Sequence, residues 1–410
     1  MLCRTSPEHE PGAVADVKSS LRIIVTGMIA QYPLGGMSWD FLNYVLGFAR
    51  LGHDVYYIED TGQWPYNPAE DGKIKSCDFN VTYLAGVMAR VGLEDRWAYR
   101  FGWTSEWFGL PDKQRQEVLR TADLLVNVSG TLERMDEYRS IRRLAYIDTD
   151  PVFTQLKLVR GQKFLRSLLD QHHVLFSFGE CLPAAVPDTG DEWIPTRQPV
   201  VLSEWRVEPE PRAAFTTVLT WVSYNPIEHD GRSYGQKDIE FRRFLDLPGM
   251  VAPIPLELAA NAGKGRKLPR HLLLHKGWKL VDPRTACPDL DGYRSYIASS
   301  RAEWSVAKNG YVQGQSGWFS CRSACYLAAG RPVVLQETGF SKVLPVGEGI
   351  LSFSTPEEAA ACIQEVDADH DRHARAARAV AEEYFDSARV LARLIERAMG
   401  NDIQNRKKLP

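Results

Sequence analysis

The stretch SGWFSCRSACYLAAGRPVVLQETGF, residues 316–340, decides the fold. It predicts a loop, then a short helix of small residues over 321–329, then a buried strand over 332–336, with Gly330 ending the helix. A helix start carries unpaired backbone N–H groups and a partial positive charge, which attract phosphates. The stretch therefore predicts a diphosphate site, and the alternative is a capped helix that precedes a core strand.

The residue types around this helix start suit an anion. Glycine lets backbone approach a ligand closely, serine hydroxyls donate hydrogen bonds, and an arginine neutralises charge with two parallel donors. The residues that we expect to bind the donor here are Gly317, Trp318, Phe319, Ser320, Arg322 and Ser323.

A polar turn follows the strand. Glu337 and Thr338 stand at what should be the carboxyl end of a parallel strand, which is where open sheets bind ligands. Glutamate accepts hydrogen bonds from hydroxyls, and threonine both donates and accepts them. The turn therefore predicts contacts to a sugar, with an ordinary polar turn as the alternative.

Composition excludes several classes of protein. The chain has 410 residues, 44% of them hydrophobic, and a formal net charge of −3, so a nucleic-acid or acidic membrane partner is not expected. We expect no membrane span, a disordered tail over 1–20, and a cytoplasmic location. The seven cysteines form no CxxC pair and the histidines lack ligand spacing, so no metal is expected. The oligomeric state stays open.

Alternating strands and helices organise the chain. A strand over 21–27, the pair Gly35-Gly36, a helix over 40–51 and a strand over 54–60 are typical of a βαβ unit. The later elements that the pattern predicts are strands over 121–130, 143–151, 172–180, 215–222 and 271–281, and helices over 237–247, 255–262, 291–301 and 369–398.

A proline-rich segment over 183–212 suggests a linker. We therefore expect an α/β fold with an N-terminal domain over 21–205 and a second domain over 213–370. A C-terminal helix over 371–410 should cross back toward the first domain.

The order of a small-residue loop, a helix, AAGRPVV and then an acid resembles the nucleotide-sugar glycosyltransferases of the GT-B fold. The resemblance implies two Rossmann-like domains whose parallel sheets face each other across a cleft. It implies an acceptor domain at the N-terminus and a donor-nucleotide domain at the C-terminus. The donor would be a UDP, GDP or dTDP sugar, a substrate and no permanently bound cofactor.

The resemblance also assigns roles. The family's loop falls on Gly317–Ser320, and its sugar-contacting acid and neighbour fall on Glu337 and Thr338. Many members carry a glutamate in the helix that binds the nucleotide ribose, and this chain has Cys325 there. Glu303 is a candidate substitute.

Two further donor contacts follow from the resemblance. Gly35 and Gly36 would reach toward the diphosphate from the first domain, although a tight turn alone would also explain them. Lys237 would contact the diphosphate from the second domain, with Arg232 and Lys308 as the alternatives.

Inverting members of this fold need a catalytic base, whereas retaining members rely mostly on stabilising the leaving diphosphate. If this chain uses a base, we expect it at strand ends that face the cleft. Asp148 and Asp150 are the first candidates, because two close carboxylates raise one pKa. Asp150 could equally cap a helix, and Glu59 and Asp60 end another strand. Asp40 is also a candidate, or a charge that satisfies a helix start.

The sequence thus predicts a metal-independent, hexosyltransferase-like glycosyltransferase. Its acceptor would be a small molecule, such as an aromatic natural product, or a glycan. The aromatic side chains of 61–110 would line the acceptor pocket: Trp64, Tyr66, Trp97, Trp103, Trp107 and Phe108. The alternatives are a nucleotide-sugar epimerase of the same fold and a non-catalytic nucleotide-sugar-binding protein.

Overall fold

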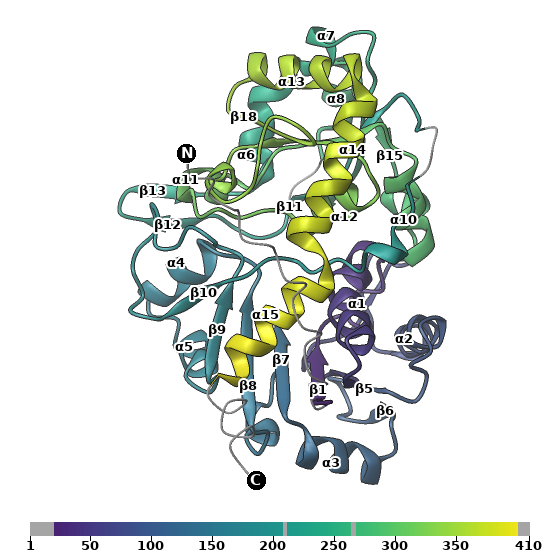
Figure 1. Ribbon diagram of the computed structural model, residues 1–410, viewed down its shortest axis with the longest axis vertical. Coiled ribbons are helices and arrows are strands. Elements are labelled where there is room, and N and C mark those ends of the chain that lie inside the picture. Colours follow the sequence, from purple (N-terminus) through teal and green to yellow (C-terminus); the bar gives the residue numbers. More distant parts are fainter. Residues whose placement is uncertain (1–19, 208–210, 264–267, 401–410) are drawn as a thin grey trace, which may run out of the picture.

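The chain folds into two α/β halves stacked along its long axis, the N-terminal half below the C-terminal half in Figure 1. The computed structural model describes residues 20–207, 211–263 and 268–400. The predicted tail therefore lies outside the described residues except for Ser20. Each half contains one large sheet.

The first sheet has the strand order β10-β9-β8-β7-β1-β2-β5-β6, and all neighbours run parallel except β6, which is antiparallel to β5. Its strands are β1 (Arg22–Thr26), β2 (Asp54–Glu59), β5 (Trp97–Arg100), β6 (Trp107–Gly109), β7 (Leu124–Val128), β8 (Arg143–Asp148), β9 (Val174–Ser177) and β10 (Trp193–Pro195). The chain leaves β1 toward one edge and returns to β7 on its other side, so a topological switch point lies between them. Ligands bind beyond the carboxyl ends of the strands at such a point.

The helices of this half are α1 (Gly35–Arg50), α2 (Asp78–Arg90), α3 (Asp112–Thr121), α4 (Phe153–Val159) and α5 (Lys163–Leu169). Short elements connect them: the hairpin β3 (Tyr66–Asn67) and β4 (Gly72–Lys73), and the 3-10 turns η1 (Met135–Tyr138) and η2 (Leu202–Glu204). The sequence predicted that α1 begins at residue 40, and this prediction was wrong. The glycine pair is the first turn of the helix.

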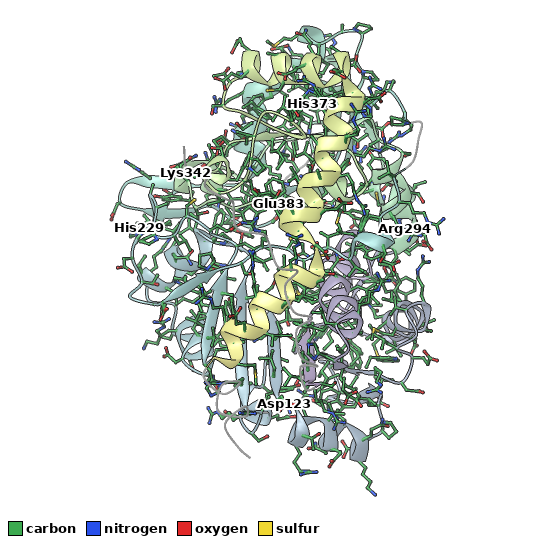
Figure 2. All side chains as sticks on the ribbon, viewed as in Figure 1. Asp123, His229, Arg294, Lys342, His373 and Glu383 are labelled. Carbon is green, nitrogen blue, oxygen red and sulfur yellow. The ribbon has the colours of Figure 1, made fainter. Side chains whose placement is uncertain are left out.

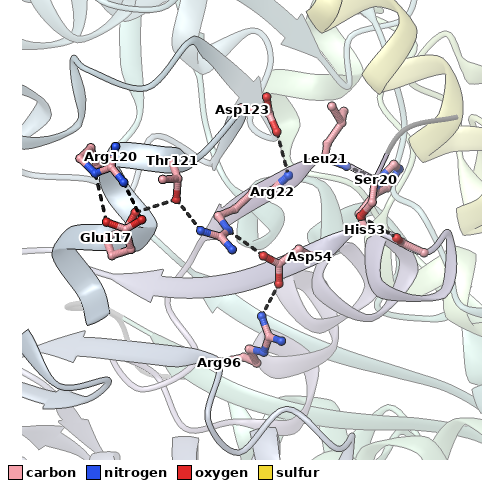
Figure 3. Close-up of polar contacts among 11 residues, drawn as sticks. Ser20, Leu21, Arg22, His53, Asp54, Arg96, Glu117, Arg120, Thr121 and Asp123 are labelled. Atoms are coloured by element: carbon pink, nitrogen blue, oxygen red, sulfur yellow. Dashed lines mark hydrogen bonds and ion pairs between the residues drawn. The ribbon is translucent and has the colours of Figure 1, made fainter. Parts of the chain in front are cut away.

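Ion pairs and hydrogen bonds connect the amino ends of the strands in the first sheet (Figure 3). The guanidinium of Arg22 in β1 donates to Asp54 of β2 at 2.6 Å, and the backbone N–H of Arg22 donates to Asp123 at 3.0 Å. Arg96 pairs with the other oxygen of Asp54. These contacts tie four chain segments together at the amino ends of the strands, opposite the carboxyl ends that line the cavities described below.

The second sheet is entirely parallel, with the order β15-β14-β11-β16-β17-β18. Its strands are β11 (Phe215–Val222), β14 (Leu256–Gly263), β15 (Lys279–Val281), β16 (Ala302–Ser305), β17 (Val333–Gln336) and β18 (Ile350–Phe353). Its helices are α6 (Lys237–Phe241), α7 (Leu247–Met250), α8 (Arg270–His275), α9 (Pro283–Ala286), α10 (Leu290–Ala298), α11 (Asn309–Gly314), α12 (Cys321–Ala328) and α13 (Pro356–Ala368). The 3-10 turns η3 (Arg242–Phe244) and η4 (Phe340–Lys342) and the hairpin β12 (Ile227–His229)–β13 (Arg232–Tyr234) complete it.

Two predicted elements of this half were wrong. Residues 255–262 were expected to be helical, because leucine, glutamate and alanine favour helices, yet they form β14 between β11 and β15. Residues 271–281 were expected to be one strand, yet they divide into α8 and β15. Burial on both faces of a parallel sheet overrides local propensity in β14, whose first five residues are all buried.

The last helices of the chain run from the second half back to the first. Helix α14 (His370–Val380) continues as a π-helical segment, η5 (Ala381–Phe385), and after Asp386 the chain forms α15 (Ser387–Met399). Glu383 of η5 lies midway along this path in Figure 2. At Gly47 of α1 an added Cβ would be 2.5 Å from Leu391, so α15 contacts α1 closely. The sequence predicted one unbroken helix, whereas the structure has a break between the halves.

Candidate active site

Two cavities lie between the halves, on either side of the start of α1. The first, of about 430 Å³, reaches the carboxyl ends of β11 and β14 and the loop before α9. The second, of about 580 Å³, reaches the carboxyl ends of β7 and β8 and the helices α4 and α5. Both cavities are lined by the same set of residues at their junction: Gly36, Met37, Asp40, Lys237, Tyr293, Lys308 and Arg322.

Helix α12 begins at the second cavity. Ser320, Cys321 and Arg322 line this cavity, and the side chain of Ser320 makes no capping hydrogen bond. The first backbone N–H groups of α12 therefore face open space with the positive end of the helix dipole. This arrangement suits an anion.

Two lysines add positive charge at the junction. Within the described residues, Lys237 at the start of α6 has no hydrogen-bond acceptor. Burial, with Arg322 and Lys308 nearby, lowers its pKa well below the usual lysine value. Lys308 already holds a partner, Asp150, at 2.8 Å. An anion bound beside Lys237 would favour its charged form.

Three hydrogen bonds fix the position of the Arg322 guanidinium. It donates to Glu303 at 2.6 Å, to the carbonyl of Val218 at 2.7 Å and to Ser305 at 2.8 Å. Glu303 is fully buried under this arginine, so it is not placed to bind a ribose at the surface of the cavity. Arg322 contributes charge to the junction from a fixed position.

Several predicted donor residues surround a small void next to the start of α12. Phe319, Ser323 and Thr338 line a separate small void of about 20 Å³, and Trp318 borders both this void and the second cavity. The hydroxyl of Thr338 donates to the carbonyl of Trp318 at 2.5 Å. These contacts shape the loop before the helix and leave little space for a sugar.

Gly317 and Glu337 also make intramolecular contacts. An added Cβ on Gly317 would be 2.8 Å from the Sγ of Cys181, and its φ is +82°. Glu337 accepts a hydrogen bond from the backbone of Gly339 at 2.5 Å. The close approach that we expected of a ligand at Gly317 is thus made by another segment of the chain.

The glycine pair of α1 lies against the second half. An added Cβ on Gly35 would be 2.1 Å from the carbonyl oxygen of Asp289, and one on Gly36 would be 3.0 Å from the ring of Tyr293. The absence of side chains lets α1 approach α10 across the domain boundary, and both glycines still line the first cavity. This contact was invisible in the sequence, because Tyr293 is remote in the chain.

Asp148 is a structural carboxylate. It is buried and accepts hydrogen bonds from Thr154 at 2.7 Å, Ser177 at 2.9 Å and Gln155 at 3.2 Å. Burial raises its pKa and these donors lower it, with a net upward shift. Both oxygens are thus engaged in fixing α4 and β9 to β8.

Asp150 joins the two halves. Its Oδ1 accepts from Lys308 at 2.8 Å and from Tyr311, and its Oδ2 accepts from Tyr224 at 2.6 Å. Burial favours the neutral carboxyl, but Lys308, Tyr224 and Tyr311 together outweigh this effect, and the pKa of Asp150 lies below its usual value. We name Asp150, Lys308, Tyr224 and Tyr311 the interdomain cluster. The sequence could not show that three residues of the second half meet this aspartate.

Asp40 differs from both. It lies in the second turn of α1, lines both cavities, and no described residue donates a hydrogen bond to its carboxylate. Burial raises its pKa to about 7, and Arg322 opposes this shift. A carboxylate with a pKa near neutrality and an open face can accept a proton from a ligand.

The remaining candidates lie apart from the junction. Glu59 is buried and accepts from the backbone of Ala30 at 2.9 Å and of Gln31, and Asp60 pairs with Arg100 at 3.0 Å. Arg232 is exposed in the β12–β13 hairpin. Cys325 is buried in α12.

The aromatic residues of 61–110 do not gather in one pocket. Tyr66 lines the first cavity, whereas Trp97 is buried in the core. Trp64 and Trp103 contact each other edge to face with centroids 4.6 Å apart, and Trp107 lies under Arg115. The predicted aromatic acceptor pocket is therefore corrected to a set of separate contacts.

The described residues contain no group of three or more His, Cys, Asp or Glu side chains that could hold a metal ion. Within the same ranges no helix is long and apolar enough to cross a membrane.

Residues 260–396 match a family described as "Glycosyl transferase-like". With the two-sheet architecture, this match confirms the predicted class, a glycosyltransferase with the GT-B fold. No curated protein sequence matches the chain.

Solved structures share the fold over nearly the whole chain. HepE from Anabaena, in complex with UDP and glucose, has a TM-score of 0.56 at 10% identity, covering 93% of this chain and 100% of its own. An α-glucosyltransferase in complex with UDP and a DNA 13-mer has a TM-score of 0.54 at 11% identity, covering 93% and 100%. AviGT4, a glycosyltransferase of avilamycin A biosynthesis, has a TM-score of 0.52 at 13% identity, covering 94% and 98%.

Proposed function

We propose that this protein transfers a sugar from a UDP-sugar to an acceptor held by the N-terminal half. The observation that supports the proposal most is the junction of the two cavities. There the uncapped start of α12 meets Lys237, which has no acceptor among the described residues, and the fixed guanidinium of Arg322. A diphosphate would accept hydrogen bonds from the first two groups and would lie close to the positive charge of the third.

The donor then has a definite orientation. The nucleoside would lie in the first cavity, against the ends of β11 and β14, and the sugar would point into the second cavity. The structures of HepE and of the α-glucosyltransferase hold UDP, which is why we propose uridine over guanosine or thymidine. Ribose recognition would not use position 325, because Cys325 is buried.

Asp40 is the residue that we assign to the acceptor. Its carboxylate faces both cavities. Unlike the carboxylates of Asp148 and Asp150, it accepts no hydrogen bond from a described residue. In the reaction it would take the proton of the acceptor hydroxyl, the hydroxyl oxygen would bond to the sugar C1, and the bond from C1 to the diphosphate would break. The leaving diphosphate would be stabilised by α12, Lys237 and Arg322.

The second cavity favours a transferase over the alternatives. An epimerase needs no acceptor space, yet about 580 Å³ lies beyond the junction on the N-terminal side. A non-catalytic binding protein has no use for an open carboxylate whose pKa is about 7. The expectation that no nucleic acid serves as the acceptor remains a prediction.

The test is a thermal unfolding assay with UDP, GDP and dTDP, because a ligand that binds only the folded state stabilises it by about 2.7 kcal/mol at 100 times its Kd. UDP should raise the melting temperature most, and Lys237→Ala should remove the rise. The matched control is Lys113→Ala, at an exposed site on α3. If none of the three nucleotides stabilises the protein, or if Lys237→Ala responds like Lys113→Ala, the proposed diphosphate site is wrong.

A further inference from the structure

A depression of about 500 Å³ on the N-terminal half adjoins the second cavity. The two share Phe164 and Leu168, which lie one turn apart on α5 and therefore on one face of the helix. The opposite wall of the depression is formed by η1 and the residues on either side of it. Cavity and depression meet at this face of α5, and we name the depression the outer groove.

Phe164 stands at the boundary between the second cavity and the outer groove. Its residue surface is 63% exposed, more than that of any other large hydrophobic residue in the described part of the chain. Single exposed apolar residues are ordinary on protein surfaces. This ring, however, lies where an acceptor longer than the second cavity would leave the cleft.

Both arginines of the outer groove are already paired. Arg134 contacts Glu137 at 3.4 Å, and Arg139 contacts Asp136 at 2.7 Å and Gln171 at 3.1 Å. With Glu133, the wall carries three carboxylates against two guanidiniums. A phosphate polymer needs unpaired cations, so a nucleic acid is not a suitable occupant. The wall instead offers both hydrogen-bond donors and hydrogen-bond acceptors.

We propose that the outer groove binds the non-reacting sugars of a neutral oligosaccharide acceptor whose terminal hydroxyl reaches Asp40. The inference rests on the proposed function and names its acceptor class. A sugar ring has an apolar C–H face, which can pack on Phe164, and hydroxyls that both donate and accept, which match the paired side chains. Each cavity alone has the volume of a small-molecule site, so the two in line exceed what one monosaccharide fills.

The experiment measures binding of neutral gluco-, manno- and galacto-oligosaccharides of one to six residues to the full chain saturated with UDP. Wild type should bind the longer oligosaccharides more tightly than the monosaccharides. Phe164→Ala should weaken the longer ones about tenfold, and Ser167→Trp, which places a bulky ring in the outer groove, should abolish the gain with length. Phe79→Ala, at a residue 47% exposed on α2, is the matched control.

The results separate the acceptor proposal from the proposed function. A melting-temperature rise with UDP that persists in Phe164→Ala shows that the donor site and the fold are intact. If that rise is present, the inference is overturned when the wild type binds no oligosaccharide. It is also overturned when Phe164→Ala and Phe79→Ala lose the same amount of affinity for the longer oligosaccharides. Binding of a DNA 13-mer that depends on Phe164 would overturn it in favour of a nucleic acid.

Discussion

The interdomain cluster should hold the two halves together, and Asp150→Asn tests this directly. The change keeps the shape of the side chain but removes the charge that accepts from Lys308, Tyr224 and Tyr311. Removing one partner of a fully buried ion pair costs about 3–5 kcal/mol. Because the side chains of Lys308 and Asp150 are 17% and 27% exposed, we expect about 2–3 kcal/mol.

This free energy should appear in the closure of the cleft. A loss of about 2–3 kcal/mol lowers the closed-to-open ratio about 30- to 150-fold, since each 1.4 kcal/mol is a factor of ten. Small-angle X-ray scattering would detect the open form as a larger radius of gyration, and urea unfolding would show the halves separating earlier. The pKa of Asp150 is lowered, so its contribution is present at neutral pH and is lost only as the pH falls through the pKa of the folded state, which lies below the usual aspartate pKa.

Two comparisons make the result decisive. Asp230→Asn changes an aspartate whose side chain is 87% exposed and should alter neither the radius nor the stability. Lys308→Met combined with Asp150→Asn should cost less than the two single changes added together, because the pair is already broken by either one. An unchanged radius of gyration in Asp150→Asn, together with additive losses in the double variant, would refute the role of the interdomain cluster.

Three further predictions follow from the site and its supports. Asp40→Asn should lower kcat at least a hundredfold while UDP binding is retained. The wild-type rate should rise with pH around a midpoint of about 7, because Asp40 must be ionised to accept a proton. Measurement of kcat as a function of pH in both proteins checks the two expectations. Gly317→Ala should destabilise the fold by more than Gly161→Ala in urea unfolding, because both glycines have a positive φ but Cys181 crowds only the former. Glu59→Gln should lower the free energy of unfolding by about 1–3 kcal/mol in the same assay. The backbone N–H groups of Ala30 and Gln31 donate to different oxygens of the carboxylate, and the N–H₂ group of glutamine cannot accept either of these bonds. An unchanged stability would contradict this role of Glu59.

Local sequence predicted five of the eight strands of the first sheet and the helix α12, because buried parallel strands are continuous apolar runs bounded by glycines, and it missed β5, β6 and β10. It failed at residues 256–263, where helix-favouring residues form the second-sheet strand β14. What decides that segment is its place between two neighbouring strands, and this is a property of the whole sheet. The π-helical segment at Ala381–Phe385 was also missed.

The candidate site was predicted in outline and not in its details. Lys237 and Arg322 were identified from their positions beside helix starts and do line the cleft. The roles of Asp148 and Asp150 depend on which side chains reach them, and Lys308 lies 158 residues beyond Asp150 in the chain. Spacing along a sequence gives no access to such partners. The open face of Asp40 was likewise a consequence of where α1 begins.

The return of α15 to the first half has a consequence for synthesis of the chain. Leu391, Leu394 and Ile395 are buried in the same core as Ile23 and Val25 of β1. The ribosome makes β1 before α15, so the N-terminal half lacks this packing layer until the second half has been synthesised. A premature stop near residue 386 would therefore expose apolar surface on the half that was made first, and chaperones or proteases would bind an N-terminal lobe whose defect lies beyond the second half of the chain.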